Sequence, residues 1–265
     1  MPEGHSIRHF ASLHHHAFVG SFIEASSPQG RFSDEASKLT DRIMTNTTAH
    51  GKHLFLHFDE DVVHIHLGLY GWFDLYKNKG QVPKESVRLR IESDAYLSDL
   101  RGPTKCALVS FDDIAKTIAK LGPDPLRDDA DPEKAWAKIH KSSKTIGALL
   151  MDQAVIAGIG NVYRAELLFI SKLSPFTPGM QVTRDTFDEI WANSVRLMSD
   201  GAKDGRIRTV SSEHISAEQV ALHGDKHYSY VYKRTNNSCL VCGSAVSSSD
   251  LAGRTVYWCG TCQRD

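Results

Sequence analysis

The hydrophobic residues of this 265-residue chain change their period along the sequence, and this change constrains the fold more than any other feature. Apolar and polar residues alternate over 54–58 and 63–67, on either side of an acidic turn, which predicts a β-hairpin with one buried face. Beyond residue 132 the apolar residues recur at helical spacing instead. Two prolines, a glycine and several aspartates at 121–131 predict a linker between these regions. The expected fold class is therefore α+β, with at least two domains.

The same patterns predict the other elements. An opening helix is expected at 6–18, before the strands. The further expected strands are 87–91 and 107–111, and the expected helices are 132–140, 146–152, 162–169 and 184–199. Residues 201–230 are rich in Ser, His and Gly and predict a long mobile loop.

Four cysteines stand in the last 27 residues as two Cys-x-x-Cys pairs separated by sixteen residues. Each pair can place two thiolates on one side of a tight turn, and two pairs complete a tetrahedral S4 site that suits one Zn²⁺. Because the protein supplies all four ligands, no position remains for water and the zinc is expected to be structural. Two disulfides or free thiols are the alternative. The expected ligands are Cys239, Cys242, Cys259 and Cys262.

Two further segments could bind phosphate. Gly158 and Gly160 allow the backbone to approach an anion closely, and Asn161 is a favourable N-cap for the helix that follows. Ala252-Gly253 predicts a turn before a strand, so that Arg254 would project from a hairpin tip, where its planar fork can bind two oxygens. On these residues alone, a structural turn without a ligand and a solvated surface arginine remain open.

The N-terminus is a candidate chemical group. Removal of Met1 would expose the secondary amine of Pro2 beside the carboxylate of Glu3. An α-amine has a pKa near 7.7–8.0, so roughly a third of it is unprotonated at pH 7.5. Such an amine can attack an aldehyde carbon and form an iminium ion, which permits elimination of a β-phosphate. An N-terminus without a chemical role is the alternative.

The fourteen histidines are conspicuous. His14, His15 and His16 are consecutive on a predicted helix and point in different directions, so they are expected on a solvated or partly packed polar face. His64 and His66 share one strand face and could chelate a metal, but no third ligand is apparent in the sequence.

Composition excludes several classes. Thirty-one Lys+Arg against 32 Asp+Glu give a net charge of −1, which excludes a uniformly basic nucleic-acid coat but permits a local basic face. No apolar run reaches 18 residues, so no transmembrane helix is expected. The first residues lack the pattern of a secretory signal, and a cytoplasmic location is expected.

Six motifs, in order, resemble those of the formamidopyrimidine-DNA glycosylase/endonuclease VIII family of base-excision repair enzymes. They are MPEG at 1–4, GKHLFL at 51–56, HLGLYG at 66–71, LGPDPL at 121–126, DQAVIAGIGNVYRAELLF at 152–169, and CLVC with GRTVYWCGTCQ near the end. MPEGHS and HLGLYG are most similar to the actinobacterial endonuclease VIII-type branch.

This resemblance implies an N-terminal β-sandwich flanked by helices, then a helical domain with a helix–two-turn–helix and a zinc-finger β-hairpin. It implies DNA in a cleft between them. The expected boundaries are a catalytic domain at 1–120, a linker at 121–131, a helical domain at 132–230 with its helix–two-turn–helix at about 146–170, and a zinc finger at 231–265.

The resemblance also implies residue roles. Pro2 would be the Schiff-base nucleophile at C1′ of the damaged nucleotide, and Glu3 the acid/base that helps to open the sugar. Lys52 would assist β-elimination, and Arg254 would hold the flanking phosphates and assist δ-elimination. The expected DNA-binding residues are Leu69, Tyr70, Arg101, Gly160 and Asn161.

Two positions depart from the family. The formamidopyrimidine branch has an Arg-x-Phe loop that fills the gap left by the flipped base, whereas this chain has Arg101 followed by Gly102 and Pro103. Many members also have a second N-terminal Glu where this chain has Ser6. A tight turn between Gly68 and Gly71 would present Leu69 and Tyr70 as an apolar wedge, with core packing at a strand end as the alternative.

The expected function is a monomeric bifunctional DNA glycosylase/AP lyase that acts on double-stranded DNA with damaged bases or abasic sites, with one structural zinc. Oxidised pyrimidines are the expected lesions. The alternatives are an oxidised-purine glycosylase, an inert DNA-damage-binding protein, and a zinc-ribbon transcription or RNA-processing factor, which would explain only the last 35 residues.

Overall fold

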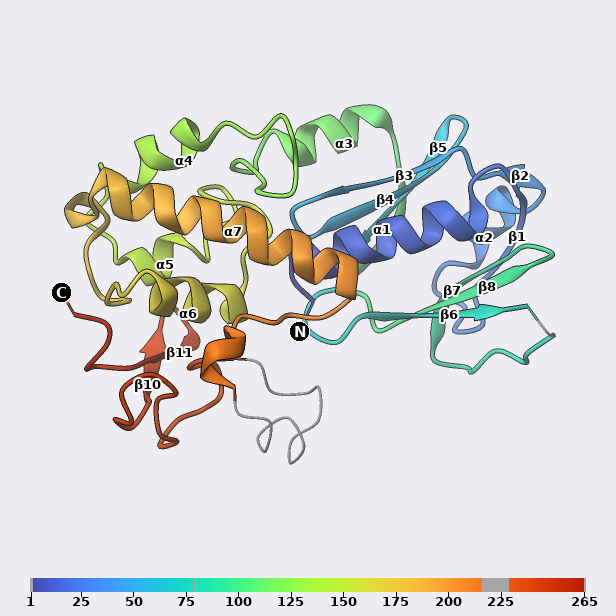
Figure 1. Ribbon diagram of the computed structural model, residues 1–265. Helices are drawn as coiled ribbons and strands as arrows, with labels where there is room; N and C mark the ends of the chain where they lie inside the picture. Colours follow the sequence, from blue (N-terminus) through green and yellow to red (C-terminus); the bar gives the residue numbers. More distant parts are fainter. Residues whose placement is uncertain (1, 79, 216–228, 265) are drawn as a thin grey trace. The chain divides into compact units, whose positions relative to one another are not determined.

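The computed structural model describes residues 2–78, 80–215 and 229–264, and the chain divides into two compact units, 1–120 and 121–265 (Figure 1). The first unit contains two antiparallel sheets with helices, and the second is mainly helical and ends in a hairpin. The expected α+β class is confirmed.

The described residues of the first unit form nine strands in two sheets. One sheet has the order β2-β1-β7-β8-β6 and the other the order β3-β4-β5-β9. Their bounds are β1 Phe22–Ser26, β2 Arg42–Ile43, β3 Asn46–His50, β4 His53–Phe58, β5 Asp61–His66, β6 Trp72–Lys77, β7 Val87–Glu92, β8 Tyr96–Arg101 and β9 Lys105–Val109.

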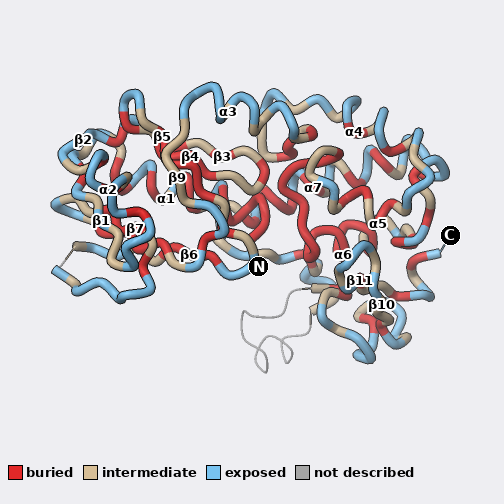
Figure 2. Tube along the Cα trace, turned by 180° about the vertical axis from the view of Figure 1, so that it is seen from behind, coloured by how far each residue is buried: buried red, intermediate tan, exposed pale blue. Residues whose placement is uncertain are grey.

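A single hydrophobic core joins the two sheets. Leu56 and Val63 of one sheet and Ile91 and Leu100 of the other belong to the same buried cluster, as does Phe10 of α1. Side chains of a strand alternate between faces, so each sheet contributes one face to this core. In Figure 2 the central strands β4 and β5 are buried, whereas β2 is exposed. The helices of this unit are α1 Gly4–Phe18, α2 Ser33–Leu39 and α3 Phe111–Ile118.

The predicted hairpin is confirmed as β4 and β5, which pair in antiparallel register and turn at Asp59, where φ is 49°. The expectation of a single buried face is wrong, because Phe55, Val62 and His64 on the other face are buried as well.

The predicted strand at 107–111 is shifted, because β9 ends at Val109 and Phe111 begins α3. The reason is a capping box: the Ser110 hydroxyl accepts a hydrogen bond from the Asp113 amide, and the Asp113 side chain accepts from the Ser110 amide.

The second unit is built around a separate core of helical side chains. Its helices are α4 Pro132–Ile139, α5 Ile146–Leu149, α6 Asn161–Ile170 and α7 Arg184–Asp204, and its hairpin strands are β10 Ser247–Leu251 and β11 Arg254–Trp258. The predicted helix at 146–152 is shorter, whereas the helix predicted at 184–199 extends to Asp204 and ends at Gly205, where φ is 70°. The first residues of the predicted 201–230 loop belong to α7 instead, and its residues 216–228 lie outside the described residues.

Residues 121–131, which are expected as a linker, belong to the second unit and bond to its turns at 153–157. The Gly122 amide donates to the Gln153 carbonyl at 2.9 Å, and the Ala157 amide donates to the Pro123 carbonyl at 3.0 Å. Asp124 is buried, and its Oδ1 accepts from the Leu126 amide. These contacts order the segment on the turns that precede α6.

Within the described ranges, no helix combines the length and the apolar character needed to cross a bilayer.

Candidate functional site

Pro2 and Glu3 are both buried at the beginning of α1. The carbonyl of Glu3 accepts from the Ser6 amide at 2.9 Å and thereby starts the helix. The carboxyl group of Glu3 therefore belongs to the N-terminal end of a helix, where the helix dipole favours negative charge. Ser6, which stands in place of the family's second Glu, is buried and bonded through Oγ to His5 Nε2 at 3.0 Å.

Lys52 lies in the tight turn between β3 and β4, where Gly51 has a φ of 56°. His53 follows it and lies opposite His66 of β5 in the sheet register. Burial lowers the pKa of both imidazoles, and the charge of Lys52 adds to the lowering. Both shifts favour the neutral imidazole beside Lys52.

The histidine face contains a member that the sequence did not indicate. His53 Nδ1 lies 2.8 Å from His64 Nε2, and the His53 ring centre lies 5.0 Å from that of His66. Burial lowers the pKa of His64 to about 3. Within the described residues, the one cluster of His, Cys, Asp or Glu arranged to hold a metal ion is the cysteine cluster.

The turn after β5 presents two apolar side chains to solvent. The Gly71 amide donates to the Leu67 carbonyl at 2.9 Å and closes the turn. Tyr70 is 86% exposed and Leu69 is 42% exposed. The alternative of core packing at these two positions is wrong, and their exposure is the requirement for a wedge that enters DNA.

Arg101 is the last residue of β8, and the turn after it packs on the turn that carries Leu69 and Tyr70, which we call the wedge turn. A Cβ added at Gly102 would lie 3.3 Å from the Tyr70 carbonyl oxygen, and the Thr104 amide donates to the His66 carbonyl. Arg101 itself forms an ion pair with Asp74 of β6. Pro103 is buried, so it adds no exposed surface to this loop.

Asn161 does not cap α6 as expected. Gly160 is the N-cap residue, and Asn161 is the first residue of the helix, buried to 6% exposure. The side chain of Asn161 is directed to the hairpin instead, where its Nδ2 donates to the Thr255 carbonyl at 3.0 Å. The tertiary contact with β11 outweighs the local preference of Asn for capping.

Arg254 begins β11 and lies half-buried next to the hairpin turn. Ala252 and Gly253 have φ angles of 53° and 70°, the left-handed pair that a two-residue hairpin turn requires. The predicted turn and strand are therefore confirmed. Because Thr255 follows Arg254 directly, the bond from Asn161 links the start of α6 to the position of Arg254.

Arg164 strengthens this link, and the sequence analysis missed it. Its side chain is completely buried, and its Nη2 donates to Asn161 Oδ1 and, at 3.0 Å, to the Thr255 carbonyl. A buried arginine needs several acceptors to replace its lost hydration. The sequence feature that could have indicated Arg164 is its single positive charge within the apolar run of the helix predicted at 162–169.

Glu166 is a second buried charge of α6 that sequence reasoning missed. Its carboxylate accepts from the amides of Tyr230, Val231 and Tyr232 at 2.6–3.0 Å and from the Thr209 hydroxyl at 2.5 Å. Burial raises its pKa, and these donors oppose the rise. Glu166 thus fixes residues 230–232, which lead into the cysteine module, on α6.

The four cysteines are brought together as predicted. Their sulfur atoms all lie within 4.8 Å of one another, with 3.9 Å between Cys239 and Cys262 and 3.5 Å between Cys242 and Cys259. Ligands of a tetrahedral Zn–S site with bonds of about 2.3 Å lie about 3.8 Å apart, so the cluster fits one structural zinc ion. Gln263 ties the module to the helices, because it bonds the Cys259 amide and the Leu173 carbonyl.

The fold and these residues define a class of protein. One unit is built of β-sheets and carries candidate catalytic side chains, and the other is helical and holds the cysteine module against the start of α6. Pro2, Glu3 and Lys52 belong to the first unit, and Gly160, Asn161 and Arg254 to the second.

Comparison with known proteins agrees with this class. Residues 1–106 match the model of the formamidopyrimidine-DNA glycosylase N-terminal domain, and residues 121–212 match that of the formamidopyrimidine-DNA glycosylase H2TH domain. Endonuclease 8 1 of Mycobacterium tuberculosis (strain ATCC 25618 / H37Rv) is 46% identical over 268 residues, which cover 99% of this chain and 100% of the relative. Formamidopyrimidine-DNA glycosylase of Legionella pneumophila (strain Lens) is 30% identical, with 83% of this chain and 81% of the relative covered.

The chain belongs to the formamidopyrimidine-DNA glycosylase/endonuclease 8 family, and it is accordingly a DNA repair glycosylase with AP lyase activity. Solved structures show the same fold. Lactococcus lactis Fpg in complex with DNA containing N7-benzyl-Fapy-dG has a TM-score of 0.80 at 22% identity, and each chain is covered completely. MutM in complex with DNA containing carbocyclic 8-oxo-G has a TM-score of 0.80 at 23% identity.

Proposed function

We propose that this protein excises oxidised pyrimidines from double-stranded DNA through a Schiff base on Pro2 and then cleaves the strand by β,δ-elimination. The observation that supports the nucleophile is the burial of Pro2 and Glu3 side by side at the N-terminal end of α1. A buried amine next to a carboxyl group can exchange protons with it while water is excluded.

The chemistry follows from a secondary amine. Once Met1 is removed, the lone pair of the Pro2 nitrogen attacks C1′ and the glycosidic bond breaks. Its electron pair leaves with the base, which takes up the proton that the Pro2 nitrogen loses. Glu3 donates a proton to the sugar ring oxygen, the ring opens, and an iminium ion joins Pro2 to C1′. Loss of a C2′ proton then expels the 3′ phosphate, and a second elimination expels the 5′ phosphate.

Charged side chains serve the elimination steps. Lys52, in its turn between β3 and β4, neutralises a phosphate and assists proton removal. Arg254 holds the flanking phosphates, in a position fixed by the bonds from Asn161 and Arg164 to Thr255. The zinc ion, held by the four cysteines, stabilises the hairpin that presents Arg254 and has no part in the chemistry.

The wedge supports the choice of oxidised pyrimidines. Tyr70 and Leu69 are exposed on one turn, whereas the second loop has a buried Pro103 where the formamidopyrimidine branch has an aromatic residue. A wedge built mainly from Leu69 and Tyr70 is the endonuclease VIII arrangement. The greater identity to endonuclease 8 1 than to the Legionella glycosylase supports the same branch.

Borohydride trapping tests the proposal, on protein whose N-terminal Pro2 is verified by intact mass. Three kinds of duplex substrate contain thymine glycol, dihydrouracil or 5-hydroxyuracil. A fourth contains 8-oxoguanine opposite cytosine. Peptide mapping is expected to place the reduced adduct on Pro2, and Pro2→Gly or retained Met1 should reduce trapping strongly. In single-turnover assays the pyrimidine lesions should be released faster than 8-oxoguanine.

Each opposite result has a defined meaning. An adduct that maps to Lys52 in the wild type would contradict the nucleophile assignment. Fastest release of 8-oxoguanine opposite cytosine would favour the oxidised-purine alternative and leave the Pro2 mechanism intact. Lesion binding without any adduct, with Pro2 verified as N-terminal, would favour the inert damage-binding alternative.

A further inference from the structure

The first turn of α1 carries a buried pair of uncharged polar side chains, a few residues after the proposed nucleophile. Ser6 Oγ and His5 Nε2 lie 3.0 Å apart, and the two residues are 7% and 3% exposed. Pro2 and Glu3, which precede them, are buried as well. Many members of the family have a second glutamate at position 6, so this chain has a neutral pair where those members have a carboxylate.

The imidazole of His5 lies within electrostatic reach of the N-terminal amine. Burial lowers the pKa of His5 to about 3, and the positive charge of the N-terminus adds to the lowering, followed by that of His9. His5 is therefore neutral near pH 7, and the hydroxyl of Ser6 carries no charge. Once Met1 is removed, the amine belongs to Pro2 and is one residue closer to this pair along the chain.

The protonation of a buried amine depends on the charges around it. Removal from water disfavours the ammonium form and lowers the pKa of the amine, whereas a nearby carboxylate favours that form and raises the pKa by roughly one to three pH units. Glu3 is one such carboxylate, and a glutamate at position 6 would be a second. At Pro2, burial therefore acts without the second carboxylate that would oppose it.

The hairpin on which α1 packs brings no carboxylate either. α1 contacts β3 and β4, which contain no Asp or Glu, and the turn between them carries Lys52. The other titratable side chains of these strands are His50, His53 and His57, and burial lowers the pKa of His53 to about 4. The charge of Lys52 disfavours a second cation in its neighbourhood.

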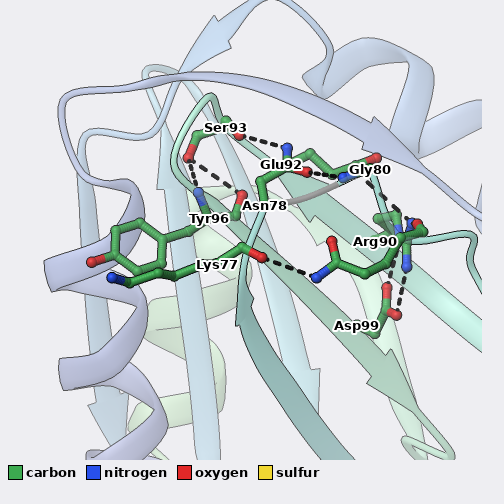
Figure 3. A network of polar contacts seen from close by, with 9 residues as sticks. Lys77, Asn78, Gly80, Arg90, Glu92, Ser93, Tyr96 and Asp99 are labelled. Atoms are coloured by element: carbon green, nitrogen blue, oxygen red, sulfur yellow. Dashed lines mark hydrogen bonds and ion pairs between the residues drawn. The ribbon is translucent and has the colours of Figure 1, made fainter.

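The carboxylates of the other sheet are paired with arginines. α1 also packs on β6 and β8, each of which contains one carboxylate. Asp99 of β8 accepts from Nε and Nη2 of Arg90 at 2.7 and 2.8 Å, as Figure 3 shows. Asp74 of β6 forms an ion pair with Arg101. Because each negative charge has its own positive partner, these strands do little to stabilise an ammonium group on α1.

We propose that the His5–Ser6 pair keeps the Pro2 amine unprotonated below neutral pH and so extends Schiff-base formation to lower pH. This inference rests on the proposed function. An ammonium group has no lone pair, so its proton must pass to water before Pro2 can attack. On an abasic site the lone pair then attacks the C1′ aldehyde, and the aldehyde oxygen leaves as water with two protons, one of them from the nitrogen. His5 and Ser6 touch no reacting atom and act only through the charge of Pro2.

Nitrogen-15 NMR measures the protonation of Pro2 without DNA. Of the nine prolines, only a verified N-terminal Pro2 is an amine and not an amide, so its signal is distinct in protein labelled with ¹⁵N-proline. We expect the titration midpoint about one pH unit below that of the exposed peptide Pro-Glu-Gly. Ser6→Glu should raise the midpoint by about one pH unit. Ser6→Gln, which has nearly the same size and no charge, should leave it unchanged.

Variants of His5 and a charge control complete the series. His5→Gln keeps a neutral partner for the Ser6 hydroxyl and should leave the midpoint unchanged, whereas His5→Glu should raise it as Ser6→Glu does. His15→Glu adds the same charge at an exposed position in the last turn of α1 and should have no effect. The wild-type midpoint tests the inference without any substitution.

Trapping connects the midpoint to the reaction. Single-turnover trapping on an abasic-site duplex, with cyanoborohydride because it is stable in acid, should follow the NMR midpoint of each variant. At pH 6, Ser6→Glu should be trapped about tenfold more slowly than the wild type, because a midpoint one pH unit higher leaves a tenth of the free amine. At pH 9 the two rates should be equal.

Three results would overturn the inference: a wild-type midpoint at or above that of the peptide, equal midpoints for Ser6→Glu and Ser6→Gln, or trapping whose pH dependence does not follow the midpoint. If the midpoints are equal while Pro2 is still trapped, the inference fails and the proposed function stands. If neither an abasic site nor any lesion traps Pro2, the proposed function itself fails.

Discussion

Arg164 shows how one buried side chain can connect two candidate phosphate contacts. Its guanidinium reaches Asn161 in its own helix and the Thr255 carbonyl in β11, and its Nη1 lies 3.5 Å from the Gly147 and Leu251 carbonyls. Charged residues are rarely buried unless they are paired. Here backbone carbonyls take the place of a carboxylate, so Arg164 determines where Asn161 and the residue before Thr255 can lie.

Arg164→Lys is expected to lower affinity for duplex DNA with a tetrahydrofuran abasic analogue by about tenfold. An ammonium group cannot span these acceptors as a planar fork does, and hydrogen bonds to a charged group contribute about 1.5–3 kcal/mol. Fluorescence anisotropy measures the dissociation constant. Arg184→Lys is the matched control, because Arg184 is an exposed arginine of the same unit, paired with Glu133 and Asp188. Unchanged affinity of Arg164→Lys would show that the hairpin is positioned without it.

The hairpin β10–β11 depends on its neighbours for a core. Val246, Cys239 and Cys259 are buried in one cluster with Phe169 and Tyr230, whose rings stack at 4.7 Å. A two-stranded hairpin is marginal by itself in water. The metal ion and α6 therefore supply the stability that keeps Arg254 at the start of β11.

Cys262→Ser should reduce the zinc content from about one ion per chain to nearly none, since a structural site needs all four ligands. DNA affinity should fall together with the zinc, because the hairpin loses its shape. Cys106→Ser serves as control: Cys106 lies outside the module, and burial raises the pKa of its thiol to about 12. Elemental analysis of protein purified without chelators measures the zinc content. An absence of zinc in the wild type would refute the assignment of a structural zinc site to the four cysteines.

Several histidine side chains are buried in the first unit, and their protonation affects the stability of the whole molecule. His14 is completely buried: its Nδ1 bonds the Phe10 carbonyl at 2.7 Å, so its Nε2 accepts from the Ser98 hydroxyl at 2.8 Å and joins α1 to β8. Burial lowers the pKa of His14 to about 4. Burial likewise lowers the pKa of His53 to about 4.

The first unit should lose stability as the pH falls below about 6.5. In the unfolded chain these histidines bind protons near pH 6.5, whereas the folded state leaves them neutral down to about pH 4, so acid favours unfolding. Between pH 7.5 and 5.5, His14 alone should remove about 1.4 kcal/mol. Urea unfolding can be followed by Trp72, the one tryptophan of residues 1–120, after Phe replaces the other three. His14→Gln should reduce the pH-dependent loss by about that amount, and an undiminished loss would contradict this account.

Local sequence patterns were sufficient to predict much of the fold and part of the site. The period of two along 54–67 was sufficient to predict the hairpin of β4 and β5, because a one-residue slip would move its apolar residues to the other face of the sheet. Spacing was equally sufficient for the cysteine cluster and for the turn at Ala252-Gly253. Motif order was sufficient for the family.

Only the tertiary structure decided which polar residues are buried and what they bond. His14 was expected on a solvated or partly packed face and is completely buried, whereas His15 and His16 are exposed as expected. Asn161 was expected to cap a helix and instead bonds a strand 94 residues further along the chain. The physical reason is the same in both cases. Secondary structure follows from neighbours within a few residues, but the partner of a buried polar group comes from whichever distant segment packs against it.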